Sequence, residues 1–331
     1  MSDLQDFIDN FRNKRVFVIG DAIIDHYIHG TVSAISPDAP VPLVEISREE
    51  HFSGALKKVI QYILNFGGDA EAISCVGKDY EGEKFQQEIA ELNVGIKGIF
   101  TLGQITPKIT RVMSKDQQLL RLEKKYNFTH QEENVLGESI VNFLKERAGR
   151  ADVILILDYD LGLLDPPIIE KVLNIANQNK KKIVVRPAST KFEHYQRVEM
   201  MHLNRDVASA SLNMNLLNET AIRIVGTKIL NTTRCNGLYV PWIEGDSYYF
   251  EKNHVNVFPT MVNEASRHFM NVSSASIAAM SLMAASSAPG ELSAKVAHLA
   301  GSLAARKEID DFFTADELKM MVENEVSTTS Q

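Results

Sequence analysis

Short apolar runs alternate with segments of helical periodicity along most of this chain, and this alternation constrains the fold more than any other feature. The runs predict strands buried on both faces, at 15–20, 71–77, 153–157 and 182–185. Helical patterns cover 55–66, 80–93, 131–148 and 166–179. Strands joined by helical crossovers pair in parallel, so the sequence predicts a doubly wound, mainly parallel α/β sheet flanked by helices.

Two stretches break this rhythm, since 25–46 and 106–123 carry hairpin-like patterns without helical periodicity. Short strands inserted at the ends of core strands would form a small sheet over the edge where open α/β sheets bind ligands. We expect a single domain over 1–331. Its core would comprise about 15–25, 49–103 and 125–325, with a β lid inserted at about 26–48 and 104–123.

Charge and cysteine content exclude several classes of partner. Lys and Arg number 35 against 43 Asp and Glu, for a formal net charge of -8. Without an overall basic surface, neither nucleic acid nor a membrane is an expected partner. Cys75 and Cys235 match no metal or redox spacing, and neither do the histidines. We therefore predict reduced thiols, a cytoplasmic location and no metal site.

The longest uncharged run is 269–290, long enough to raise the question of a membrane span. It contains one Asn and several Ser residues, which are uncommon in such number in a lipid-facing helix. We expect a helix of small residues buried in the core.

Several motifs follow one another in an order typical of a known family. The distinctive ones are Val18–Asp21 followed by Asp25, then Ser33–Pro42, Ile109–Met113 and Gln117–Glu123, with weaker anchors at 65–68, 76–79, 158–159 and 204–205. On these residues the chain resembles the ribokinase-like (pfkB) carbohydrate kinases, most closely the heptose-phosphate kinase domain of ADP-heptose synthesis. The resemblance spans about 15–310.

The resemblance implies ATP-dependent phosphoryl transfer to a sugar hydroxyl with Mg²⁺. It places the sugar phosphate against Asp21, Asp25, Gly54, Lys57, Arg111 and Arg121, and the nucleotide near Asn204 and Gly237. It also implies a dimer through the lid, as a homodimer or with an active paralogue, because apolar lid strands need covering.

The catalytic loop departs from the family pattern. Such kinases carry Asp-x-x-Gly-Ala-Gly-Asp, whose amides hold the phosphoryl group and whose last Asp is the base. The aligned stretch here is 261–267, with Glu264 and Ser266 in place of the glycines and Arg267 in place of the base. A guanidinium cannot accept a proton at physiological pH. Glu264 either occupies the anion site itself or is a first-turn helix residue that faces water, and we expect Arg267 to bind anions beside Asp21 and Asp25.

Other phosphate-handling positions differ as well. Lys57 replaces an Asn, the turn 158–162 lacks its Lys, the Asp-Pro-Lys stretch is 186–188, Val207 replaces a Glu, and 232–235 replaces Thr-Arg-Gly-Glu. These departures predict a pseudokinase, impaired or inactive, that binds ATP and Mg²⁺ weakly or not at all and acts by binding a sugar phosphate or a partner. An active kinase using Asp158, Asp160 or Glu264 as the base is one alternative, and a structural subunit without a ligand is the other.

Overall fold

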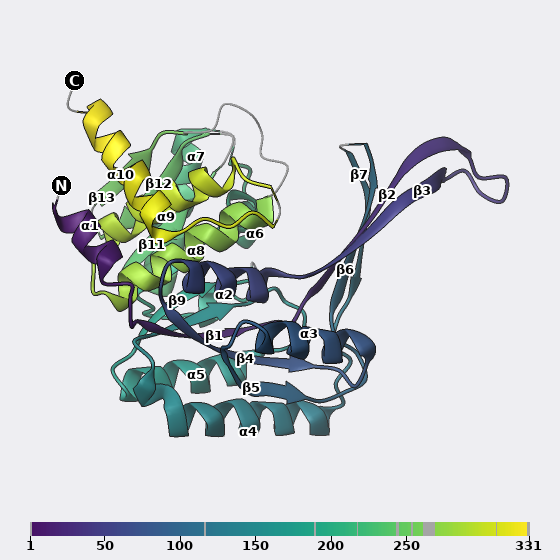
Figure 1. Ribbon diagram of the computed structural model, residues 1–331, viewed down its shortest axis with the longest axis horizontal. Coiled ribbons are helices and arrows are strands. Elements are labelled where there is room, and N and C mark those ends of the chain that lie inside the picture. Colours follow the sequence, from purple (N-terminus) through teal and green to yellow (C-terminus); the bar gives the residue numbers. More distant parts are fainter. Residues whose placement is uncertain are drawn as a thin grey trace.

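A nine-stranded sheet forms the centre of the computed structural model, which describes residues 2–115, 117–188, 190–216, 218–242, 245–252, 254–260, 269–308 and 310–329. The strands lie in the order β13-β12-β11-β10-β9-β8-β1-β4-β5 (Figure 1). Their bounds are β1 Arg15–Gly20, β4 Asp69–Val76, β5 Gly95–Thr101, β8 Val153–Leu157, β9 Lys182–Arg186, β10 Met200–His202, β11 Gly237–Val240, β12 Ser247–Glu251 and β13 His254–Phe258. From β5 to β11 neighbours pair in parallel, whereas β12 and β13 are antiparallel.

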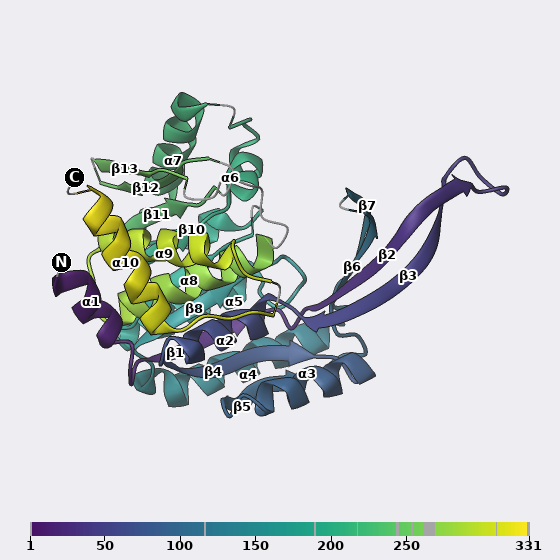
Figure 2. The same cartoon turned by 45° about the horizontal axis from the view of Figure 1, so that its top comes forward.

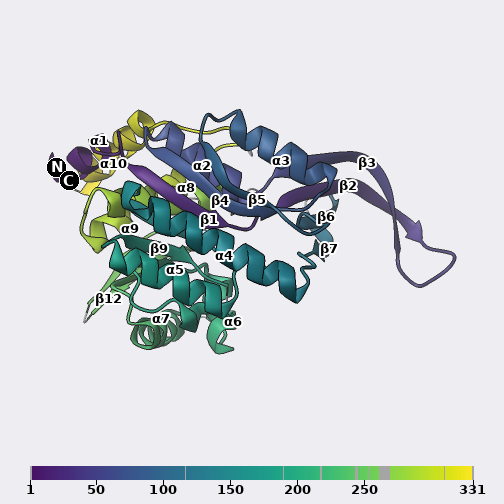
Figure 3. The same cartoon turned by 90° about the horizontal axis from the view of Figure 1, so that it is seen from below.

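Helices cover both faces of this sheet, as the continuous apolar strands require. On one face, Val16 and Val18 of β1 join a core with α1 Ser2–Asp9, α2 Ala55–Asn65, α3 Tyr80–Ala90, α8 Phe269–Ala285, α9 Gly290–Ala304 and α10 Ala315–Thr329. On the other, Phe17 and Ile19 join a core with α4 His130–Arg147, α5 Pro166–Gln178, α6 Arg205–Leu212 and α7 Glu219–Thr233 (Figure 3). Short 3-10 turns lie at Ala148–Arg150 and Phe192–His194. The predicted doubly wound fold is confirmed.

The uncharged run forms α8 and then leads into α9, and these two helices pack against each other and against the sheet. From Val272 to Ala285 every residue of α8 is buried, including several serines. Ser281 satisfies its hydroxyl within the helix, donating to the Ile277 carbonyl at 2.8 Å. This is the buried helix of small residues that the sequence predicts. None of the described helices combines the length and apolar character needed to cross a bilayer.

A second, four-stranded sheet leaves the body of the molecule where β1 ends. Its strands are β2 Ile24–Ile35, β3 Pro42–Ser53, β6 Lys108–Ser114 and β7 Gln117–Lys124, in the order β3-β2-β6-β7. The hairpin of β2 and β3 projects well beyond β6 and β7 (Figure 2). The terminal helices α1 and α10 pack together at the opposite end of the molecule. The smaller sheet predicted from the two hairpin-like stretches is therefore present.

Gly20 ends β1 where that strand approaches β8 most closely. A Cβ at Gly20 would lie 2.8 Å from the Leu157 Cβ and 2.9 Å from the Leu157 carbonyl oxygen. We expect Gly20→Ala to lower the free energy of unfolding by about 1–3 kcal/mol, because overpacking forces the strands apart. Urea titration followed by circular dichroism measures the change. Gly149→Ala is the control, since a Cβ there meets no described atom within 4 Å. Equal losses in the two variants would contradict the packing argument.

Candidate functional site

The carboxyl ends of the parallel strands gather polar and charged side chains at one edge of the main sheet, here called the carboxyl edge. Asp21 follows β1, Asp158 follows β8, Arg186 ends β9, and Asn204 lies just past β10. The second sheet begins at the same edge, because β2 starts four residues after β1 ends. Open α/β sheets bind their ligands at this edge, so these residues define the candidate site.

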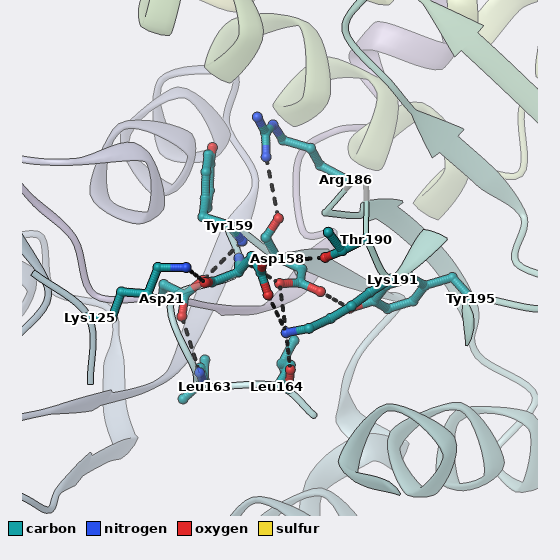
Figure 4. A network of polar contacts seen from close by, with 11 residues as sticks. Asp21, Lys125, Asp158, Tyr159, Leu163, Leu164, Arg186, Thr190, Lys191 and Tyr195 are labelled. Carbon is teal, nitrogen blue, oxygen red and sulfur yellow. Dashed lines mark hydrogen bonds and ion pairs between the residues drawn. The ribbon is translucent and has the colours of Figure 1, made fainter. Parts of the chain in front are cut away.

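Asp21 is fixed by backbone amides of the loop after β8. The Tyr159 N–H donates to its Oδ2 at 3.0 Å, and the Leu163 N–H lies 3.4 Å from its Oδ1 (Figure 4). Burial, and secondarily the charge of Asp158, raises the pKa of Asp21 to about 7. Asp21 therefore joins β1 to the β8 loop and changes its charge near neutral pH.

Asp158 and Asp160 share the cation of Lys191 (Figure 4). The Lys191 Nζ lies 2.9 Å from Asp160 and 3.9 Å from Asp158, and the Tyr195 hydroxyl donates to Asp158 at 2.8 Å. Burial lowers the pKa of Lys191, but the two carboxylates outweigh it and raise that pKa overall. Asp158 and Asp160, two of the three residues considered as displaced bases, are thus engaged by other side chains.

Arg186 packs against Tyr159 and Asp158 of the loop after β8. Its guanidinium stacks on the Tyr159 ring at 4.0 Å, and its Nη1 lies 3.4 Å from the Asp158 carbonyl oxygen. Where the family carries Asp-Pro-Lys, this chain places an arginine that packs on the β8 loop.

Asp25, on β2, is buried and forms an ion pair with Arg111 of β6. The same guanidinium lies over the Tyr27 ring at 5.2 Å. Gly54 makes room for the carboxylate, since a Cβ there would lie 2.6 Å from the Asp25 Oδ2. Burial raises the pKa of Asp25, and Arg111 followed by Lys58 opposes that rise. Among the described residues, the Asp25 Oδ2 has no hydrogen-bond partner.

The structure brings together some of the predicted sugar-binding residues and separates others. Arg121 on β7 lies directly opposite Arg111 in the antiparallel register, and it bonds Glu123 at 2.6 Å. Lys57 instead bonds Glu88 of α3 at 2.7 Å, beside a cavity of about 290 Å³. Its neighbour Lys58, almost fully buried, is the lysine whose charge acts on Asp25. Consecutive residues of α2 point in different directions, so Lys57 pairs with Glu88 whereas the charge of Lys58 acts on Asp25.

On the nucleotide side, the two predicted residues lie at opposite edges of the sheet. Asn204 is the N-cap of α6 at the carboxyl edge, and its buried Oδ1 has no partner in the described part of the chain. Gly237 starts β11 at the amino edge, where a Cβ would lie 2.6 Å from the Tyr249 hydroxyl. The glycine is therefore needed for packing between strands.

The alignment of 232–235 with Thr-Arg-Gly-Glu also needs correction. These residues end α7 and precede β11, so they lie at the amino edge. The carboxyl end of β11 leads instead to Pro241 and Trp242, and the Arg205 guanidinium stacks on the Trp242 ring at 3.8 Å. Sequence analysis missed this pair, although the apolar run at 238–240 was the available signal for the strand end.

The catalytic-loop residues Glu264, Ser266 and Arg267 fall within 261–268, outside the described residues. The placement of Glu264 in the anion site and the proximity of Arg267 to Asp21 and Asp25 therefore stay predictions.

The main sheet, its helices and the second sheet together define a ribokinase-like fold. The phosphofructokinase-2 of Escherichia coli, solved with substrates and products, superposes with a TM-score of 0.72 at 16% identity, over 93% of this chain and 98% of that one. The ribokinase of Arabidopsis thaliana, solved with ribose and ATP, gives 0.73 at 11% identity over the same shares. These likenesses establish the fold.

Sequence comparison points to a narrower group. The bifunctional protein HldE of Geobacter metallireducens is 29% identical over 259 residues, 76% of this chain and 52% of that protein. The HldE of Syntrophotalea carbinolica is 26% identical over 267 residues, 80% of this chain and 54% of that protein. The chain thus spans about half the length of the curated relatives it matches, and no family model matches it. The resemblance to ribokinase-like carbohydrate kinases close to HldE is confirmed.

The raised pKa of Asp21 predicts a pH dependence of stability. Its pKa is 3.8 in a model peptide and about 7 here, so between these values the folded state binds more protons than the unfolded state. Its contribution is fully present below about pH 4 and is lost as pH rises through about 7. Asp21→Asn should flatten this decline between about pH 4 and pH 7, measured by urea unfolding at each pH. Parallel curves for the two proteins would contradict the assignment.

Proposed function

We propose that this chain binds a sugar phosphate between the carboxyl edge and the second sheet, which serves as a lid over about 26–48 and 104–123, and that it is impaired or inactive in phosphoryl transfer. The observation that carries the proposal is Asp25, whose buried Oδ2 has no hydrogen-bond partner among the described residues while its other oxygen is held by Arg111. A buried carboxylate oxygen gains most from a hydroxyl donor, and a sugar supplies several.

The charged residues around Asp25 suit a phosphorylated sugar. Arg111 and Arg121 face each other on neighbouring strands, and guanidinium groups bind phosphate bidentately. The resemblance to heptose-phosphate kinases supplies the substrate class, a heptose phosphate. The sugar ring would lie against Asp25 and Gly54, with the phosphate toward the arginines.

The nucleotide side fits ATP and Mg²⁺ poorly. The Asn204 Oδ1 suits a water of Mg²⁺, but Val207, one turn along α6, offers no oxygen. The cavity lined by Tyr239, Trp242 and His298 has about 20 Å³, room for a water molecule and not for an adenine ring. The substitutions at 264, 266 and 267 remove the amide cradle and the base, which commonly contribute about 10²–10³-fold and 10²–10⁴-fold.

An active kinase with a displaced base is the second candidate, and one observation favours it. A carboxyl group with a pKa of about 7, such as Asp21, is suited to general base catalysis at neutral pH. Against this, both of its oxygens face backbone N–H groups, and Asp158 and Asp160 are engaged by Tyr195 and Lys191. A structural subunit without a ligand is the third, and it predicts no sugar-phosphate binding.

Exposed apolar side chains on the second sheet support association through the lid. They are Val32, Ile35, Val41, Leu43, Ile46, Leu120 and Leu122. A homodimer or a pair with an active paralogue in the cytoplasm would cover them. A tetrameric inhibited form of the Escherichia coli phosphofructokinase-2 is among the similar solved structures. Light scattering coupled to gel filtration should give twice the chain mass, and Leu120→Glu with Leu122→Glu should give the monomer.

Calorimetric titration tests the binding proposal. Heptose 7-phosphate should bind, and Arg111→Gln should weaken it roughly 10–100-fold, the worth of a hydrogen bond to a charged group. Arg121→Gln should act in the same direction without leaving Asp25 unpaired. Arg223→Gln, on the exposed side of α7, is the matched control and should bind normally. If no sugar phosphate binds, the proposal is wrong and the structural subunit without a ligand is favoured. If ATP binds with Mg²⁺ at a dissociation constant in the low micromolar range, the proposed loss of the nucleotide site is wrong.

Restoring the catalytic base alone should not restore phosphoryl transfer. Arg267→Asp supplies a carboxylate, but Glu264 and Ser266 still deny the phosphoryl group its amides. We expect measurable transfer from ATP only when Glu264→Gly, Ser266→Gly and Val207→Glu accompany it. A coupled assay for ADP release compares the single and fourfold variants. Robust turnover by the unaltered chain or by the single variant would favour the active-kinase alternative.

A further inference from the structure

Two histidines and a glutamate meet on the face of the second sheet that points away from Asp25 and Arg111. His26 on β2 lies opposite His51 on β3, and Glu49 is two residues before His51 on the same face. One ligand atom from each of the three residues lies within 4.8 Å of the other two. Sequence analysis expected no metal site, because His26 and His51 acquire their proximity only from the hairpin register.

The three side chains lie close enough to share a single cation. The imidazole rings of His26 and His51 are stacked, with centroids 4.1 Å apart and an interplanar angle of 15°, so the exposed His51 ring must turn to direct a nitrogen at an ion bound by His26. The His26 Nε2 lies 2.8 Å from the Glu49 Oε2. Two imidazoles and one carboxylate are the ligand set of many three-residue zinc sites, with water in the fourth position. His51 and Glu49 are exposed, which leaves an open side for that water.

Thr110 on β6 contacts the His26 ring nitrogen that is not bonded to Glu49. Its Oγ1 lies 3.2 Å from the His26 Nδ1. A hydroxyl can donate or accept, so Thr110 suits both tautomers of His26. Without a metal, the Nε2–H donates to Glu49. With a metal on Nε2, the Nδ1–H donates to Thr110, which is the outer hydrogen bond that orients metal-binding histidines.

The neighbouring cations Lys108 and Lys84 are each paired with a carboxylate, which reduces their repulsion of a metal ion. Lys108 bonds Glu81 at 2.8 Å, and Lys84 lies 3.8 Å from Glu88. The carboxylate of Glu49 is the only one that the cluster itself contributes.

We propose that His26, Glu49 and His51 bind one divalent first-row transition cation, with Zn²⁺ as the ion to test. Imidazole nitrogen suits Zn²⁺, Cu²⁺ and Ni²⁺ far better than Mg²⁺ or Ca²⁺, so the site is distinct from any phosphate-associated metal. The ion would join β2 to β3 at the base of the projecting hairpin. This proposal does not depend on sugar-phosphate binding, which involves the opposite face of β2.

Titration of the metal-free full chain with ZnCl₂, read by calorimetry and by elemental analysis after dialysis, tests the site. We expect about one Zn²⁺ per chain and a rise of the unfolding temperature with Zn²⁺, since a ligand of the folded state stabilises it. CoCl₂ should give the visible absorption bands of tetrahedral Co²⁺. His51→Gln, an exposed position, should abolish binding, and Thr110→Val should weaken it roughly 10–100-fold.

His29→Gln provides the matched control. His29 on β2 pairs with Glu50 at 2.8 Å on the other face of the hairpin, with no third ligand among the described residues. Its loss should leave Zn²⁺ affinity and stoichiometry unchanged. Lack of Zn²⁺ binding by the parent chain, equal binding by His51→Gln, or an equal loss in His29→Gln would each overturn the assignment.

Discussion

The parallel register that holds β1 between β4 and β8 determines where every polar group of the site lies. Val16 pairs with Ala70 on one side and Val153 on the other, and β1 and β8 then end at the paired residues Gly20 and Leu157. Gly20 permits the last step of this approach, because its missing Cβ leaves space for Leu157. Asp21 and Asp158 consequently emerge side by side, and the second sheet starts from the same point.

Asp21 and Asp25 are both buried carboxylates and lie four residues apart in the sequence, but their surroundings differ. Asp21 accepts from the backbone amides of Tyr159 and Leu163 and lies beside the carboxylate of Asp158, so burial prevails and its pKa rises to about 7. Asp25 receives the guanidinium of Arg111, which opposes the effect of burial. The first group is suited to holding the β8 loop, whereas the second keeps one oxygen available. An uncompensated charge at either position would be costly.

Structural features that follow from hydrophobic periodicity could be predicted from the sequence, whereas features that follow from strand register could not. Apolar runs at 15–20 and 153–157 predicted β1 and β8 correctly, and motif order led to the ribokinase-like fold. The alignment of 232–235 failed because β11 begins only at Gly237, so the nucleotide-side residues were sought at the wrong end of a strand. Lys57 was chosen because it aligns with an Asn of the family, and the sequence does not reveal the rotation of α2 that brings the charge of Lys58 to act on Asp25. The pairing of His26 with His51 follows from hairpin geometry alone.

Along its length, β2 joins the body of the molecule to the tip of the hairpin. This strand has 12 residues, and at about 3.3 Å per residue it spans roughly 40 Å. Asp25 lies at the body end of β2, one residue after the strand begins, while the exposed apolar side chains of the hairpin tip lie at its far end. The apolar tip and Asp25 therefore belong to one continuous strand, and any displacement of the tip must pass the register shifts at His29/Gly30 and Val32/Ala34 before it reaches Asp25.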